Sequence, residues 1–412
     1  MARSPPASDA QSSLKCLKDA TSALRADRVT VNASADHTAT RVREAMHQPG
    51  ALYRNFVALI FWGRQEYTAI LRPYMERELA IHGGAVDEIW LCMTTTLPSD
   101  LAAGHSWARD VPQVRAFETA KYSRIAGDVN YCYEGLLPRV ASANGWSLRN
   151  TLVAKVDDDV VYIERHALAR LAAHKIFHSS LSFQQHGLVV ANVVNHGHLL
   201  YLHAALGAWP GYKNLTYHGH VGLTGRTEYV TPGNSMHYHF LEHERRGNTS
   251  AYHFRTWDLN ACQCTGLVNS FKNRCAAGRY YRWAINTVAF GGGFMMKGGA
   301  MPMPFPDDND EWWIVAGWQS GESQSGERVL SPALAEPPHS EVVGSAVVVH
   351  YAYNRQRKAG IDRNGKFLRY YSTLGAQLKA ELLKTRLHKS GLKAGANKGG
   401  RARRSVGGGG DI

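Results

Sequence analysis

The sequence predicts an α/β domain organised around a largely parallel β-sheet. Short, continuous apolar runs recur along the chain, which is the pattern of strands buried on both faces of such a sheet. A stretch with helical spacing separates the first two runs, so residues 56–94 read as a β-α-β unit with a right-handed crossover. With 44% hydrophobic and 20% charged residues, the composition excludes wholesale disorder, collagen and coiled-coil fibres.

Three segments define the first β-α-β unit. Residues 56–62 form an apolar strand that ends before a glycine. In residues 65–81 the apolar side chains recur at helical spacing, and Gly83 and Gly84 provide the stop signal. Residues 88–94 supply the second strand.

Strands and helices continue to alternate after this unit. Residues 151–156 form a third buried strand that runs directly into three aspartates, and the apolar pattern continues beyond them. A late strand ends at His350. The remaining predicted elements are helices over residues 114–125 and 198–206, and strands over residues 160–163, 189–194, 283–290 and 342–349.

We expect a single main domain over residues 55–355. An N-terminal extension, residues 1–54, precedes it, and a C-terminal helical segment, residues 356–383, follows it. Residues 210–282 are rich in Gly, His, Tyr and Asn and poor in periodic apolar pattern. This part of the domain is therefore expected to be rich in loops and to contact a ligand.

Positive charge is concentrated at the C-terminus. The chain has 47 Lys and Arg against 34 Asp and Glu, a net charge of +13. Eight basic residues and no acidic residue lie between Lys384 and Arg404, so the rest of the chain carries an excess of only about +5. We expect residues 384–412 to form a disordered basic tail that contacts polyanions without specificity.

The sequence leaves the cellular compartment open. No apolar run approaches the roughly 20 residues of a membrane span, and the first residues lack the apolar core of a secretory signal. We expect a soluble protein, in the cytoplasm or, if the native N-terminus is missing, in a secretory lumen. Six cysteines are too few for a disulfide scaffold, and N-glycosylation triplets such as that at Asn248 would matter only in that lumen.

Three consecutive acids at a strand end are the main functional signal. Asp157, Asp158 and Asp159 follow a buried strand, and ligands of open α/β sheets bind at this end of the strands. On an extended backbone, Asp157 and Asp159 would face one cavity while Asp158 points elsewhere. Crowded carboxylates need proton uptake or a cation, and Mg²⁺ or Mn²⁺ prefers such oxygen ligands.

The segment from Lys155 to Ile163 resembles the DxD segment of GT-A-fold glycosyltransferases. The likeness extends to Leu59–Tyr67, to Arg115–Ile125, to a strand-terminal His350, and to the order of elements over roughly residues 55–355. It implies a GT-A-like (Rossmann-like) mixed, mostly parallel sheet flanked by helices. It also implies transfer of a sugar from a nucleotide-diphosphate sugar to a hydroxyl of a glycan, protein or small-molecule acceptor.

The resemblance also implies roles for individual residues. Asp157, Asp159 and His350 would bind Mn²⁺ or Mg²⁺, while Asp158 would orient the site or reach the ribose. The nucleotide-sugar would also contact Gly63, Arg64, Lys121 and Arg124. If the enzyme inverts the anomeric centre, the acceptor-side base would be Asp308, Asp310 or Glu311.

Each of these assignments has a structural alternative. An acidic triplet is often a solvated turn or helix cap, and a histidine at a strand end can be a satisfied core residue. Acids at 307–311 also suit a helix N-terminus, and Lys121 and Arg124 suit an ordinary charged helix face.

Two rival functions remain open. His239-Phe-Leu-Glu242-His243 fits the H-x-x-E-H pattern of zinc metallohydrolases, within a His-rich segment at 237–243. Its flanks offer little support for a helix, and no third ligand can be assigned. The other rival is a non-catalytic protein that binds nucleic acid through the basic tail. A P-loop or dinucleotide site is excluded because Gly291-Gly-Gly293 lacks the residues that either motif requires.

Overall fold

The structure is a computed structural model of the 412-residue chain. The described residues are 36–119, 132–133, 137–196, 199, 202–204, 206–210, 230–258, 287–292, 318–322, 328–332, 339–352, 356–357 and 360–399.

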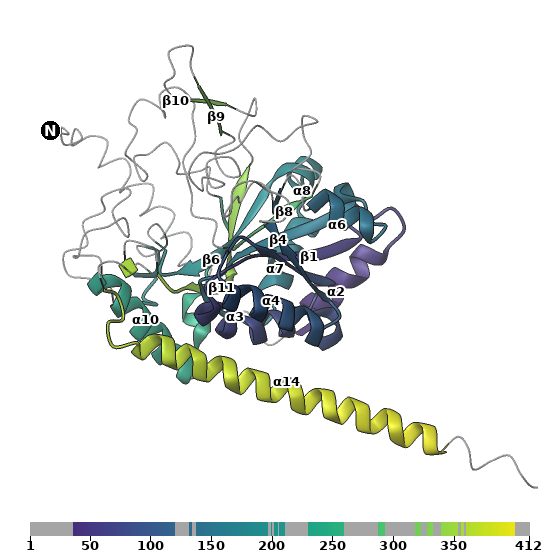
Figure 1. Ribbon diagram of the computed structural model, residues 1–412. Helices are drawn as coiled ribbons and strands as arrows, with labels where there is room; N and C mark the ends of the chain where they lie inside the picture. The colour runs from purple at the N-terminus through teal and green to yellow at the C-terminus, as the bar shows by residue number, and fades with distance from the viewer. Residues whose placement is uncertain are drawn as a thin grey trace, which may run out of the picture.

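A single mixed sheet of nine strands forms the centre of the molecule (Figure 1). Its order is β3-β2-β1-β4-β8-β6-β11-β5, and β7 pairs with β11 off this path. Four strand pairings are parallel and four are antiparallel, so the α/β class and the mixed sheet are confirmed, whereas a mostly parallel sheet is not. The strands are β1 (Asn55–Trp62), β2 (Glu88–Met93), β3 (Val114–Glu118), β4 (Thr151–Asp157), β5 (Val160–Ile163), β6 (Leu188–Val194), β7 (Trp257–Asp258), β8 (Thr287–Gly291) and β11 (Ser340–His350).

Helices pack on this sheet, and two further strands form a separate hairpin. Helix α7 contacts β6, β8 and β11, whereas α3 contacts β5 and α4 contacts β2 and β3. The pair β9 (Trp318–Glu322) and β10 (Arg328–Pro332) is antiparallel. The α-helices are α2 (Asp36–His47), α3 (Gln65–Glu78), α4 (Pro98–Asp110), α6 (Leu137–Ala143), α7 (Ala167–Phe177), α8 (Leu181–His186), α10 (Val230–Arg245) and α14 (Lys366–Gly399).

The first β-α-β unit forms as predicted. Strands β1 and β2 are parallel neighbours, and β1 is buried along nearly its whole length, as a continuous apolar run requires. Helix α3 ends at Glu78, three residues before the expected end, and a 3-10 turn (Ala80–His82) follows. The two glycines end this turn: Gly83 has a φ of 90°, and a Cβ on Gly84 would lie 1.9 Å from the carbonyl oxygen of Glu78. Only glycine can occupy this second position without moving the backbone.

Two local predictions are wrong. The helix expected over residues 114–125 begins instead as strand β3, because the short β-forming segment Val114–Glu118 pairs with β2. Part of the segment expected to be loop-rich, residues 210–282, is the 16-residue helix α10. Its buried face contains Met236, Phe240 and the polar His237, so a count of apolar residues alone underestimates its helical periodicity.

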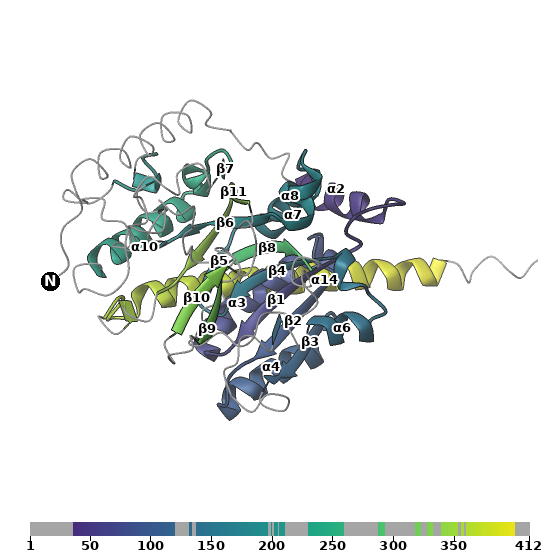
Figure 2. The same ribbon diagram turned by 90° about the horizontal axis from the view of Figure 1, so that it is seen from above.

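The terminal segments contribute helices to the packed structure. Helix α2 lies against α7 (Figure 2) and buries Ala39, Val42 and Met46 in the main core. Helix α14 packs along α3, and its C-terminal end projects beyond the rest of the ribbon (Figure 1). The basic tail expected to be disordered from residue 384 is therefore helical as far as Gly399, in keeping with the helix propensity of its Lys, Leu and Ala residues. No helix among the described residues is both long and apolar enough to cross a membrane.

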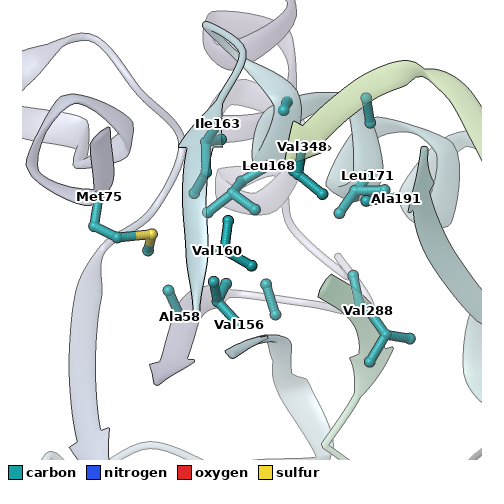
Figure 3. Packing of buried hydrophobic residues seen from close by; sticks show 14 of the residues in the cluster. Ala58, Met75, Val156, Val160, Ile163, Leu168, Leu171, Ala191, Val288 and Val348 are labelled. Atoms are coloured by element: carbon teal, nitrogen blue, oxygen red, sulfur yellow. The ribbon is translucent and has the colours of Figure 1, made fainter. Parts of the chain in front are cut away.

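One hydrophobic cluster joins the sheet to its helices. Figure 3 shows side chains from β1, β4, β5, β6, β8 and β11 meeting Met75 of α3 and Leu168 and Leu171 of α7. A disulfide joins Cys92 of β2 to Cys132, with a Cα–Cα distance of 5.9 Å.

A buried histidine in this core has a defined tautomer. Asn192 donates through Nδ2 to the carbonyl oxygens of Tyr252 and Gly344, each at 2.8 Å, so its Oδ1 is left to accept from His203 Nε2 at 2.7 Å. His203 Nδ1 is buried and has no partner among the described residues. Burial lowers the pKa of His203 to about 3, because a second proton would place an uncompensated charge in the core.

We expect His203 to make folding sensitive to acid. Between its unfolded pKa of 6.5 and its folded pKa of about 3, the unfolded state binds more protons, so stability falls as the pH falls. This one group should contribute a slope of about 1.4 kcal/mol per pH unit within that window. Urea unfolding of the wild type and of His203→Gln between pH 4 and 7 measures the slope.

Gln at position 203 can still donate to Asn192 but does not titrate, so the variant should have the shallower slope. His388→Gln, at an exposed position of α14, is the matched control and should keep the wild-type slope. Equal slopes for His203→Gln and the wild type would contradict the assignment.

Candidate functional site

Three predicted segments meet at one edge of the sheet. Strands β1 and β4 are parallel, and β8 lies antiparallel to both β4 and β6, so β6 and its parallel neighbour β11 run in the same direction as β1. The carboxyl ends of these strands therefore lie at one edge. Gly63 and Arg64 follow β1, the three aspartates lie at the end of β4, and His350 ends β11.

Arg64 holds two of the three aspartates. Its Nε donates to Asp158 Oδ2 at 2.9 Å, its Nη2 donates to Asp158 Oδ1, and its Nη1 lies 3.0 Å from Asp159 Oδ2. Arg64 has a φ of 41° at the N-terminus of α3, a left-handed conformation that is uncommon outside glycine. Gly63 permits the close approach, because a Cβ there would lie 3.1 Å from Asp158 Oδ2.

Asp159 is the most heavily paired acid of the group. In addition to Arg64, its Oδ2 lies 3.1 Å from Arg357 Nη1, and its Oδ1 lies 3.2 Å from His350 Nε2. Burial acts to raise the pKa of Asp159, but His350 and the two arginines outweigh it and hold the pKa well below the usual range. Asp159 is therefore ionised although its side chain is only 7% exposed.

The pKa of Asp158 shifts in the opposite direction. Burial raises it above the ordinary value, and the hydrogen bonds and charge of Arg64 offset only part of that effect. The neighbouring charge of Asp159 also raises the pKa. The two adjacent acids thus have unequal environments within one ion-pair network.

Asp157 pairs with a lysine of its own strand. Its Oδ1 lies 2.5 Å from Nζ of Lys155, which is two residues earlier on the same face of β4. The prediction that the side chains alternate, with Asp157 and Asp159 in one cavity and Asp158 elsewhere, is wrong. Residues 158 and 159 form the turn between β4 and β5, so strand periodicity ends at Asp157. Strand β5 then pairs with β11 and does not extend β4.

A buried polar network supports the end of β11. Asn195, directly after β6, donates through Nδ2 to the carbonyl oxygens of His350 and Tyr351 at 3.2 and 2.9 Å. Nε2 of His237, in α10, lies 2.8 Å from the carbonyl oxygen of Tyr351. The hydroxyl group of Tyr351 donates a hydrogen bond to Asp362. Asp362 also accepts hydrogen bonds from the first backbone amides of α14. The position of His350 therefore depends on two helices distant in sequence.

Sequence reasoning missed Arg357 and Asn195. Arg357 lies seven residues after His350 in a segment without a motif. Asn195 carried a usable signal, because it directly follows a buried strand and asparagine tolerates the left-handed conformation that it adopts, with a φ of 64°. Lys121, Arg124, Asp308, Asp310 and Glu311 lie outside the described residues.

Protein cations already offset the acidic charge. The sequence argument required proton uptake or a metal ion, but two guanidinium groups and one ammonium group contact the three carboxylates. A metal ion could still be held: the 3.2 Å between Asp159 Oδ1 and His350 Nε2 suits two ligands of one ion at bond lengths of about 2.1 Å. Such an ion would compete with the arginines for Asp159.

The rival H-x-x-E-H segment lies on a helix after all. His239, Glu242 and His243 belong to α10, so the objection that no helix could support them is wrong. Glu242 instead pairs with Arg245 and Arg246 at 2.9 and 3.3 Å, and the described residues bring no third ligand to this pair of histidines. Three of the six cysteines, Cys262, Cys264 and Cys275, also lie outside the described residues.

A hollow of about 370 Å³ lies away from the acids. It is lined by α6 and by residues 145–149, including Trp146. No ionisable side chain other than Arg149 lines it. It therefore offers little acid, base or metal chemistry.

Asp159→Asn should destabilise the protein at neutral pH. The substitution leaves Arg64 and Arg357 without one carboxylate, and since both arginines reach solvent we expect a loss of about 1–3 kcal/mol. The depressed pKa means that the contribution is fully present above pH 3.8 and declines as the pH falls below it, so the difference between the two proteins should be smaller in acid. Urea unfolding at pH 7 and at pH 3 tests both statements.

Asp110→Asn is the matched control. Asp110 is an exposed aspartate whose Oδ2 lies 3.1 Å from Arg72 Nη2, and exposed pairs contribute at most about 1 kcal/mol. A loss at Asp159 no larger than that at Asp110 would show that the network does not support the fold.

No known protein-family model matches this chain, and no curated protein matches it significantly.

Proposed function

We propose that the protein is a metal-dependent glycosyltransferase of the GT-A type, which moves a sugar from a nucleotide-diphosphate sugar to an acceptor hydroxyl. The observation that carries the proposal is the convergence of Asp158, Asp159, Arg64 and His350 at the carboxyl edge of the sheet. These residues come from three strand ends, as a nucleotide site of an α/β sheet requires.

Arg64 is suited to bind the diphosphate of the donor. Its side chain is 37% exposed, yet Asp158 and Asp159 fix its orientation. A guanidinium group can donate two parallel hydrogen bonds to a phosphate, and holding it in place reduces the entropy lost on binding. Arg357, also bonded to Asp159 and 26% exposed, supplies a second cation at the same edge.

Asp159 and His350 would hold the metal ion, whereas Asp157, paired with Lys155, would have to move to become a third ligand. Asp157 is the most exposed of the three acids, with 23% of its side chain accessible. When bound, Mn²⁺ or Mg²⁺ supplies positive charge that stabilises the departing diphosphate. Asp158 serves to orient Arg64, and Gly63, which permits the close approach of Asp158, would contact the donor beside the turn.

Two parts of the proposal concern other regions of the chain. The acceptor base remains assigned to Asp308, Asp310 or Glu311, and Lys121 and Arg124 remain assigned to the nucleotide.

The Cys92–Cys132 disulfide favours an oxidising compartment, since such bonds persist there. The exposed position of Asn248 is compatible with glycosylation in a secretory lumen.

A donor screen with the full-length protein tests the activity. We expect one nucleotide-diphosphate sugar to raise the melting temperature only when Mn²⁺ or Mg²⁺ is present, and to be turned over with release of the nucleoside diphosphate. Asp159→Asn should reduce turnover by about 100-fold or more, because it removes a metal ligand. Arg64→Lys should mainly raise the KM for the donor, because lysine cannot bind a phosphate through two parallel hydrogen bonds.

The assays are run at a temperature at which every variant is folded. Asp110→Asn removes an aspartate–arginine pair outside the site and should retain wild-type turnover. His243→Ala should also retain it, whereas loss of activity in this variant would favour the metallohydrolase. The proposal fails if Asp159→Asn turns over the donor as fast as the wild type.

A further inference from the structure

A second cluster of ligating side chains lies at the opposite edge of the sheet. Strand β11 ends at His350, whereas Glu341 lies at its beginning. His174 is in the last turn of α7, and His178 directly follows that helix. One ligating atom from each of His174, His178 and Glu341 lies within 4.8 Å of the other two.

Three imidazoles share one carboxylate in this cluster. Nε2 of His174 lies 2.5 Å from Glu341 Oε2, and Nε2 of His178 lies 3.5 Å from Oε1. Nε2 of His339 lies 3.3 Å from the same Oε1. The latter two distances match the spacing of about 3.3 Å between ligands of a tetrahedral zinc ion with bonds of about 2.05 Å.

Phe183 packs against the three imidazole rings. Its ring centroid lies 4.0 Å from that of His178, 5.2 Å from that of His339 and 5.9 Å from that of His174. Phe183 is buried and belongs to α8, so the orientation of the histidines is supported by a core side chain. Ligands whose rings are held by packing lose little entropy on binding a metal.

The nearest buried cation is directed elsewhere. Lys175, adjacent to His174, donates to the carbonyl oxygens of Phe183 and Gly187. The contrast with the candidate active site is clear, because there Arg64 and Arg357 pair with the acids. At Glu341 the partners described above are histidines, which bind a metal ion when neutral.

We propose that His174, His178 and Glu341 bind a zinc ion, with solvent completing its coordination and His339, 3.3 Å from Glu341, lying beside the group. Imidazole and carboxylate donors suit this ion. The ion would join the end of α7 to the beginning of β11, segments separated by more than 160 positions in the sequence. The site is therefore a structural clamp, independent of the proposed transferase chemistry.

Zinc binding to the full-length protein, purified without a polyhistidine tag, tests the site. After treatment with a chelator and desalting, the wild type should take up one equivalent of Zn²⁺ in a calorimetric titration, and its melting temperature should rise. The double variant His174→Asn/His178→Asn should bind at least about 100-fold more weakly, and Glu341→Gln should weaken binding while preserving the side-chain shape.

Two control variants distinguish this site from other zinc ligands. His105→Asn alters an exposed histidine whose Nε2 lies 2.6 Å from Glu118, a similar pair without the other histidines, and should bind zinc normally. Asp159→Asn should also bind normally, which separates the clamp from the candidate active site. The inference is overturned if the wild type takes up no zinc, if both cluster variants bind as the wild type does, or if Asp159→Asn alone abolishes uptake.

Discussion

Compensation of buried negative charge is the constraint on which the candidate site depends. Asp158 and Asp159 lie in a turn at the end of a buried strand, where an unpaired carboxylate would be strongly destabilising. Arg64 reaches both acids from the neighbouring strand end, and Arg357 and His350 reach Asp159 from the other side. The side chains of the protein thus pair both acids, and two partly exposed guanidinium groups lie at the site.

The same constraint explains the polar residues behind the site. His350 contributes to the network only if the end of β11 is held in place, and Asn195 and His237 do so by hydrogen bonds to backbone carbonyl oxygens. Asp362 connects this end of the strand to the first turn of α14. A helix that packs outside the sheet thus helps to position a residue at its edge.

The two ends of β11 differ in how their acids are neutralised. At the carboxyl end, His350 and two arginines hold Asp159 in an ionised state. At the amino end, Glu341 is surrounded by imidazoles, and although burial opposes ionisation, His174 and its neighbours lower the pKa of Glu341. A guanidinium group is always charged and can bind phosphate, whereas neutral imidazoles are metal ligands, so the same strand supports two kinds of chemistry.

Local sequence pattern determined the buried strands and the first β-α-β unit, because the periodicity of apolar side chains is set by backbone geometry. It also identified the acids, His350 and Gly63 as belonging to strand ends. Only the tertiary structure decided the pairing order of the strands, the strand at Val114–Glu118 and the helix at Val230–Arg245, since these depend on partners far along the chain. The different partners of the three aspartates were also decided by the tertiary structure, because a turn ends the strand periodicity after Asp157. The contact of Arg357 with Asp159 was decided there too, because charged groups pair through space and not by their spacing in the sequence.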